Sequence, residues 1–308
     1  MSHGGVLVCL SDYPDELVRQ WVPGAVEVVV AERELPVTAA YSALRRADVV
    51  IADAARRLVL DAPAIGQLDR CRLVVVPAVG IEVSLDVTAA GERGLRIVNA
   101  AGYNADAVAD WTVAAIIDAL RRPRDLRETG WVAQPLGREL GSVTVGLVGH
   151  GAIGRAVERR LNGFGTTVLH TTSRPPADGT DPGWVSLPEL FAASDVVSLH
   201  APLTPATAGM VDAPLLASMP ADSILINTAR GALVVEPDLV AALRIGRPAT
   251  AVLDVFAEEP LPADHPLREL DSVRLTPHVA AGTWQARERV RGIVAGHLRV
   301  AFGIPPTD

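Results

Sequence analysis

Three residues whose side chains can do chemistry follow apolar runs in the second half of the chain. Arg230 stands in "INTARG", Glu259 in "AVLDVFAEEP" and His278 in "LTPHVAAG". Such apolar runs predict buried strands, and open parallel sheets bind their ligands at the carboxyl ends of the strands. Histidine titrates near neutral pH and arginine stays charged, so the set could exchange a proton with a bound anion. Taken singly, each residue also has a structural interpretation, as a surface ion pair, a turn acid or a satisfied histidine.

A glycine-rich turn supplies the second pattern. Gly149, Gly151 and Gly154 form a Gly-x-Gly-x-x-Gly motif after the β-like run "SVTVGLV" and before a helical stretch. In a dinucleotide-binding unit the first glycine permits the tight turn, the second lets the backbone approach the pyrophosphate, and the third lets helix and strand pack closely. The motif alone is weak, but its position between strand and helix predicts a dinucleotide site. His150, inside the turn, is interpreted as a variable position without a catalytic role.

The segment "HTTSRPP", residues 170–176, lies where an NAD-binding unit usually carries an acid. That acid accepts hydrogen bonds from the adenosine ribose and would repel the 2′-phosphate of NADP. Here Thr172 and Ser173 can donate hydrogen bonds, and Arg174 can pair with a phosphate. The segment therefore predicts NADP(H) as the preferred cofactor. The alternative is NAD(H), with the segment a solvated strand end.

Composition excludes several other classes of protein. All 28 basic residues are arginines, so a P-loop, a Schiff-base lysine and the Tyr-x-x-x-Lys set of short-chain dehydrogenases are impossible. The net charge of −8 argues against nucleic acid as a partner. No apolar run reaches the roughly 18 residues that span a membrane, so we expect a cytoplasmic protein without a membrane partner. Cys9 and Cys71 are too few for a disulfide framework, and the histidine spacing predicts no metal site.

Short apolar runs alternate with helical stretches in two series, which predicts two doubly wound, parallel α/β domains. Between the series, "NADAVADWTVAAIIDALRR" predicts a helix with Asn104 as its N-cap. This helix is apolar on most sides, so we expect it to pack between domains or between subunits. A last helix is expected over about 285–299. These limits predict a dinucleotide-binding domain at 101–283, and a second domain built from 1–100 plus 284–308.

Together these motifs resemble the D-isomer-specific 2-hydroxyacid dehydrogenase family over nearly the whole chain. The resemblance implies a Rossmann cofactor domain inserted into a flavodoxin-like substrate domain, and a homodimer. It implies that Arg230 orients the substrate, that His278 is the acid/base and that Glu259 is the carboxylate partner of His278. It also implies that Val79 and Gly80 lie in a loop whose amides receive the substrate carboxylate.

The same resemblance implies which further residues line the cofactor. Asp254 matches the aspartate that holds the nicotinamide carboxamide. Besides the glycines and Thr172, Ser173 and Arg174, the matching positions are Ala152, Ile153, Ala201, Thr228, Ala229, Asp254 and Ala280.

The implied reaction is hydride transfer between a nicotinamide cofactor and a small D-2-hydroxy acid or 2-keto acid. A keto-acid reductase, such as a glyoxylate or hydroxypyruvate reductase, is favoured. Two alternatives stay open: a dehydrogenase of another small anion, of the phosphoglycerate, phosphite or formate type, and a dinucleotide-sensing corepressor. Two departures concern the substrate loop, where Glu82 replaces the usual aspartate and Asp86 lies one residue further along than usual. No regulatory C-terminal domain is expected.

Overall fold

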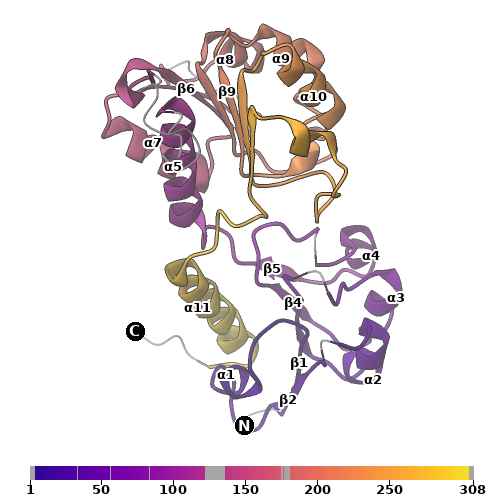
Figure 1. The fold of residues 1–308 in the computed structure, drawn as a ribbon. Helices are drawn as coiled ribbons and strands as arrows, with labels where there is room; N and C mark the ends of the chain where they lie inside the picture. Colours follow the sequence, from indigo (N-terminus) through magenta and orange to yellow (C-terminus); the bar gives the residue numbers. More distant parts are fainter. Residues whose placement is uncertain are drawn as a thin grey trace, which may run out of the picture. The chain divides into compact units, whose positions relative to one another are not determined.

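The chain forms two compact units, Met1–Asn104 with Trp284–Asp308, and Ala105–Thr283 (Figure 1). Each unit is built on a parallel sheet with helices on both faces, which confirms the predicted pair of parallel α/β domains. The computed structural model describes residues 4–32, 34–55, 57–82, 84–121, 136–174, 176 and 181–304.

The first unit contains a five-stranded sheet in the order β2-β1-β3-β4-β5, which is the flavodoxin-like order. Its strands are β1 (Val6–Cys9), β2 (Glu27–Val30), β3 (Val49–Ile51), β4 (Leu73–Val76) and β5 (Ile97–Asn99). Its helices are α1 (Asp15–Arg19), α2 (Tyr41–Leu44), α3 (Ala62–Ile65), α4 (Val87–Glu92) and α11 (Trp284–Ala301).

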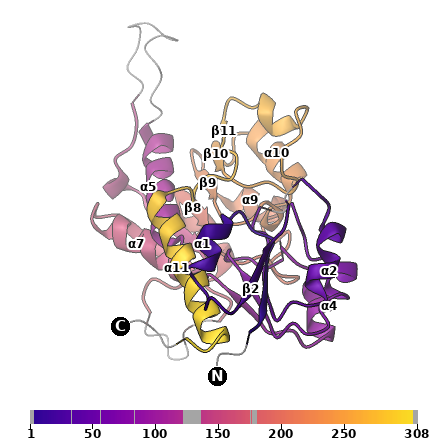
Figure 2. The ribbon, with the colours of Figure 1, turned by 90° about the horizontal axis from the view of Figure 1, so that it is seen from below.

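The two faces of this sheet are covered by different helices, because alternate strand residues point to opposite faces. Leu7 and Ile51 pack with residues of α1 and α11, whereas Val8 and Val50 pack with residues of α2, α3 and α4. Figure 2 shows α1 and α11 side by side. A helix from the end of the chain thus completes the core of the unit that holds its beginning.

The second unit contains a six-stranded sheet in the order β11-β10-β9-β8-β6-β7. Its strands are β6 (Thr144–Val148), β7 (Thr167–Thr171), β8 (Val196–Leu199), β9 (Ile224–Asn227), β10 (Thr250–Leu253) and β11 (Val273–Leu275). Its helices are α5 (Ala105–Arg121), α7 (Ala152–Asn162), α8 (Leu187–Ala193), α9 (Ala213–Ser218) and α10 (Glu236–Arg244). The strand order reverses between β6 and β8, and open α/β sheets bind ligands at such a switch point.

Helix α5 is the apolar helix that the sequence predicts between the two series. Its Val113 and Ile116 share a core with Val157 and Leu161 of α7, so its buried side belongs to the second unit. The helix begins at Ala105, so Asn104 stands at the predicted N-cap position, but its side-chain oxygen is buried and accepts no hydrogen bond. No helix in the described part of the chain is both long and apolar enough to cross a membrane.

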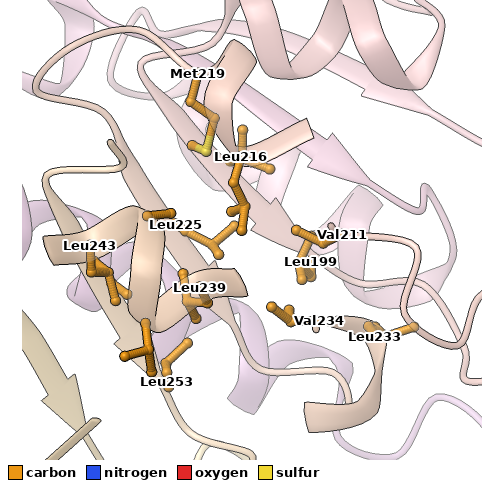
Figure 3. Close-up of a cluster of buried hydrophobic side chains, with 14 of the residues drawn as sticks. Leu199, Val211, Leu216, Met219, Leu225, Leu233, Val234, Leu239, Leu243 and Leu253 are labelled. Carbon is orange, nitrogen blue, oxygen red and sulfur yellow. The ribbon is translucent and has the colours of Figure 1, made fainter. Parts of the chain in front are cut away.

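Helices α8, α9 and α10 cover the other face of the six-stranded sheet. Figure 3 shows Leu216 near Leu225 of β9, with Leu239 and Leu243 of α10 in the same cluster. All four side chains are buried, and removing such a side chain usually costs about 2–5 kcal/mol. This packing fixes the carboxyl end of β9, where the segment 228–230 begins.

Candidate active site

The glycine motif forms the turn between β6 and α7. Gly149 has a φ of 99°, and its N–H donates to the Thr171 carbonyl at 2.9 Å. A Cβ on Gly149 would lie 2.7 Å from the Ala201 nitrogen, and one on Gly154 would overlap the Gly149 carbonyl oxygen, so both positions require glycine. A Cβ on Gly151 would meet no atom within 4 Å. This open space at the N-terminus of α7 fits a pyrophosphate approaching the backbone N–H groups.

The segment that follows β7 lies beside this turn. Thr171 is paired with Val148 of β6, and its carbonyl holds Gly149. Thr172, Ser173 and Arg174 come next and are exposed, and the Thr172 hydroxyl donates to the Arg174 carbonyl at 2.7 Å. The three residues expected to bind a 2′-phosphate therefore follow the residue that holds the glycine turn.

Two histidines meet beside the turn. The rings of His150 and His170 stack with their centroids 3.9 Å apart and their planes 13° apart. His150 Nε2 lies 2.8 Å from Glu158 Oε2, and His170 Nε2 lies 3.0 Å from Asp181 Oδ2.

This cluster brings three candidate metal ligands together, because one ligand atom each of His150, Glu158 and His170 lies within 4.8 Å of the others. A zinc ion needs nitrogen lone pairs that converge at about 2.0–2.1 Å. The lone pairs of nearly parallel stacked rings lie in two separate planes instead, so one ion cannot lie in the plane of both rings. The geometry therefore suits a stacked pair, anchored by carboxylates, that stiffens the glycine turn.

Arg230 lies in a tight turn at the end of β9. The Asn227 side chain holds this turn: its Nδ2 donates to the Arg230 carbonyl at 2.8 Å, and its Oδ1 accepts from Ala229 N–H at 3.0 Å. Gly231 packs so closely on Phe256 that a Cβ there would overlap the Phe256 backbone. The position of the Arg230 backbone is thus set by the Asn227 side chain and by the segment that follows β10.

Asp254 follows β10 and is fully buried, with 0% of its surface exposed. Its Oδ1 accepts from the Thr276 hydroxyl at 2.5 Å and from Val279 N–H at 2.9 Å, and its Oδ2 accepts from Ala280 N–H at 2.9 Å. Its backbone carbonyl accepts from His278 N–H at 2.8 Å. Asp254 therefore fixes the loop that carries His278, whereas its contact with a carboxamide remains a prediction.

His278 pairs with Glu259 as the resemblance implies. His278 Nδ1 lies 2.9 Å from Glu259 Oε2, and Glu259 Oε1 accepts from Phe256 N–H at 3.1 Å. The His278 side chain is 40% exposed, against 18% for Glu259. His278 has a φ of 55°, a left-handed conformation that costs a side-chain-bearing residue about 1–3 kcal/mol. With Nδ1 engaged by the carboxylate, Nε2 is the ring nitrogen left to exchange a proton.

The residues described so far share one edge of one sheet. Strand β10 pairs with β9 on one side and with β11 on the other. Arg230 follows β9, Asp254 and Glu259 follow β10, and His278 follows β11. The structure therefore places the predicted catalytic residues at the carboxyl ends of three adjacent strands.

Two buried polar atoms directly follow β8 and β9 at this edge. The Thr228 hydroxyl and His200 Nδ1 are buried and have no hydrogen-bond partner. Burial lowers the pKa of His200 to about 4, so its ring is neutral at pH 7. Unpaired buried groups cost about 1–3 kcal/mol each, so a bound group that offers partners would be stabilised there.

The predicted substrate loop lies in the first unit, after β4. The Val79 carbonyl accepts from Asn99 Nδ2 at 2.6 Å, which ties the loop to β5. Asp86, the displaced acid of this loop, caps α4 by accepting from Ala89 N–H at 3.0 Å. Its role in the described structure is therefore to begin a helix.

Three supporting residues were not anticipated from the sequence: Asn227, Gly231 and Thr276. Each stands next to a predicted site residue, but its role depends on a contact with a neighbouring loop. The only local indication was that "INTARG" and "LTPH" each place a small polar residue directly after an apolar run.

Comparison with known proteins adds independent information. Residues 113–280 match the sequence model of the D-isomer specific 2-hydroxyacid dehydrogenase, NAD binding domain. A glyoxylate reductase of Korarchaeum cryptofilum is 38% identical over 264 residues, which are 80% of this chain and 78% of that protein. A D-3-phosphoglycerate dehydrogenase of Mycobacterium tuberculosis is 36% identical over 269 residues, 85% of this chain but only 50% of that protein. The crystal structure of a glyoxylate reductase from Paecilomyes thermophila superposes with a TM-score of 0.85 at 25% identity, covering 99% of this chain and 98% of that chain.

Proposed function

The chain belongs to the D-isomer-specific 2-hydroxyacid dehydrogenase family of nicotinamide-dependent oxidoreductases, and we propose that it reduces a small 2-keto acid with NADPH as its preferred donor. The observation that carries this proposal is the pair formed by His278 and Glu259, with 2.9 Å between Nδ1 and Oε2. Glyoxylate and hydroxypyruvate are the substrates we favour, in line with the similarity to glyoxylate reductases.

His278 delivers the proton in this proposal. Glu259 accepts the hydrogen bond from Nδ1 and so fixes the tautomer and the orientation of the ring. Nε2 then donates its proton to the oxygen of the substrate carbonyl as charge develops on that oxygen. In the reverse direction the same nitrogen accepts the proton from the hydroxyl group.

Arg230 holds the substrate. Its planar guanidinium can bind a carboxylate with two hydrogen bonds and polarise the adjacent carbonyl, and it stays charged throughout the reaction. The amides of Val79 and Gly80 are proposed to receive the same carboxylate. When bound, the reduced nicotinamide supplies the hydride to the carbonyl carbon.

The cofactor is proposed to lie along the carboxyl edge of the six-stranded sheet. The open space at Gly151 and the unpartnered Thr228 hydroxyl both fit a dinucleotide. The pyrophosphate would meet the N-terminus of α7. The residues proposed to line the cofactor are Gly149, Gly151, Ala152, Ile153, Gly154, Ala201, Thr228, Ala229, Asp254 and Ala280.

The preference for NADPH rests on the segment after β7. No carboxylate stands between 171 and 176, so nothing in this stretch would repel a 2′-phosphate. Thr172 and Ser173 offer hydroxyl donors, and Arg174 offers a charged fork.

Turnover of a substrate panel tests the reaction. We expect NADPH-dependent reduction of glyoxylate and hydroxypyruvate, slower reduction of pyruvate and of bulkier keto acids, and no oxidation of phosphite or formate. If the chain turned over only phosphite or formate, it would instead be a dehydrogenase of that anion with the same fold. Absence of turnover with every substrate, despite binding of the cofactor, would favour a dinucleotide-sensing protein.

The exchange of Thr172 for Asp tests the cofactor preference. A carboxylate at this position repels the 2′-phosphate, so the ratio of kcat/KM for NADPH to that for NADH should fall by about tenfold or more. Thr167→Asp is the matched control, because it adds the same charge at the exposed amino end of the same strand. Equal ratios in wild type and Thr172→Asp, or a higher kcat/KM for NADH in the wild type, would refute NADPH preference.

Homodimeric assembly and a cytoplasmic location are further parts of this proposal. Light scattering of the purified chain should give twice the mass of 32.4 kDa. A monomer at micromolar concentration would contradict the first of these.

A further inference from the structure

The first unit contains a cavity that the proposed reaction does not use. Its volume is about 250 Å³, and it lies between the amino ends of β4 and β5 and the last turns of α11. Arg72 directly precedes β4, whereas the predicted substrate loop at Val79 follows the other end of the same strand. The cavity therefore lies at the opposite edge of the sheet from the loop proposed to receive substrate.

Its polar lining is entirely basic. Arg72, Arg96 and His297 are the polar residues of its wall, and none of the described residues that line it is a carboxylate. This is unusual for a chain with a net charge of −8. Arg72 and Arg96 are both exposed, so water screens part of their mutual repulsion, and an anion between the two guanidinium groups would remove the rest.

The two arginines also differ from their neighbours in the sequence. Arg70 pairs with Asp48 at 3.4 Å and Arg93 with Asp69 at 3.7 Å. Among the described ion pairs, none involves Arg72 or Arg96. Their charges are therefore available to a ligand.

Arg72 is held in place by the end of α11. One of its guanidinium N–H groups donates to the Ala301 carbonyl at 2.8 Å, and its guanidinium carbon lies 5.8 Å from the Phe302 ring centroid. The carboxyl end of a helix carries partial negative charge, which would disfavour a bound anion. The hydrogen bond from Arg72 offsets that charge at its own carbonyl and leaves the other guanidinium N–H groups for a ligand.

We infer that this cavity binds a small dianion, such as a phosphate ester or a dicarboxylate of a few carbons. The forks of Arg72 and Arg96 bind its oxyanion groups, and His297 adds a third donor. Val98 and Val300 supply the apolar wall for a short carbon chain. The volume suits such a metabolite and is too small for a dinucleotide.

Adding anions to the chain while the NMR signal of the His297 ring is followed tests this inference without any assay of turnover. The chain is labelled at histidine Cε1, and the His297 signal is identified by its loss in His297→Gln. Inorganic phosphate and succinate are added separately at constant ionic strength, with acetate as the monoanion. We expect a saturable shift of the His297 signal with phosphate, succinate or both, and none with acetate. Phosphate alone identifies a phosphate site, and succinate alone a dicarboxylate site.

Variants of the arginines show whether the anion that shifts the His297 signal binds in this cavity. Arg72→Gln and Arg96→Gln should each weaken binding by about tenfold or more. Arg70→Gln removes the same charge from the same segment and should leave affinity within twofold. Arg96→Gln removes no side-chain hydrogen bond of the described structure, so it remains informative if Arg72→Gln lowers Tm. The inference fails if no dianion gives a saturable shift, if both cavity variants bind like wild type, or if Arg70→Gln loses as much affinity.

Discussion

Each sheet buries one aspartate just beyond the carboxyl end of a strand, and the two aspartates differ in what they hold. Asp53 follows β3, is 1% exposed and accepts from backbone N–H groups two to five residues further along. Asp254 follows β10, is 0% exposed and accepts from N–H groups 25 and 26 residues further along. One carboxylate closes its own loop, and the other joins the loops of two adjacent strands.

This difference shows how similar scaffolds come to carry different chemistry. A buried carboxylate must be hydrogen-bonded in either sheet, because an unpaired buried charge is very unfavourable. When its partners are local, the result is a rigid turn. When its partners lie on the next strand's loop, the same hydrogen bonds hold a distant side chain, here His278, in a left-handed conformation that it would otherwise avoid.

The largest effect is expected where the proposed proton donor is removed. His278→Ala should lower kcat about 10³-fold, within the range of general acid catalysis, while the affinity for NADPH stays within about threefold. His265→Ala is the matched control, because His265 also lies near a carboxylate, with 3.4 Å between Nε2 and Glu236 Oε2. Steady-state kinetics and cofactor fluorescence measure the two quantities. Near-normal turnover in His278→Ala would show that His278 is not the proton donor.

The glycine turn and the alternation of strands and helices could be predicted from the sequence, because both depend on local spacing. Gly149 needs its positive φ for the tight turn that the Gly-x-Gly-x-x-Gly motif already predicts. The hydrogen bonds that Asp254 accepts from the loop of His278 could not be predicted, since they depend on the register of β10 against β11.

The stacking of His150 on His170 could not be predicted from the sequence either. It forms because Leu147 of β6 pairs with His170 of β7, which brings the glycine turn over that strand. Asn104 shows a related limit, since the sequence predicts its position before α5 but its side-chain oxygen makes no cap hydrogen bond. Side-chain contacts between loops require the strand register, which periodicity alone does not supply.

The second prediction tests the two aspartates directly. Asp53→Asn and Asp254→Asn each replace one accepting oxygen by a donor, so each should lower the free energy of unfolding by about 1.5–3 kcal/mol. Only Asp254→Asn should also lower kcat, by about 30- to 100-fold, because it loosens the loop of His278. Its kcat–pH profile should change as well, since His278 would no longer be held against Glu259.

Urea unfolding and steady-state kinetics of both variants measure this contrast. Asp53→Asn serves as the control for destabilisation by itself, because it changes the same chemical group in the other sheet. Equal losses of kcat in the two variants would mean that Asp254 acts only through stability.

The smallest effect concerns His200, which follows β8 at the same edge as His278 but is partly buried where His278 is exposed. Burial lowers its pKa from 6.5 to about 4, so the unfolded chain binds more protons than the folded chain between these two values. The stabilisation is complete above pH 6.5 and is lost as the pH falls toward 4. By pH 5 the contribution of His200 to the free energy of unfolding should have decreased by about 2 kcal/mol.

His200→Asn lacks this proton site and should show a correspondingly smaller loss between pH 7.5 and pH 5 in urea unfolding. Equal slopes in wild type and His200→Asn would show that His200 titrates like an exposed histidine, and that burial at this edge does not keep its ring neutral.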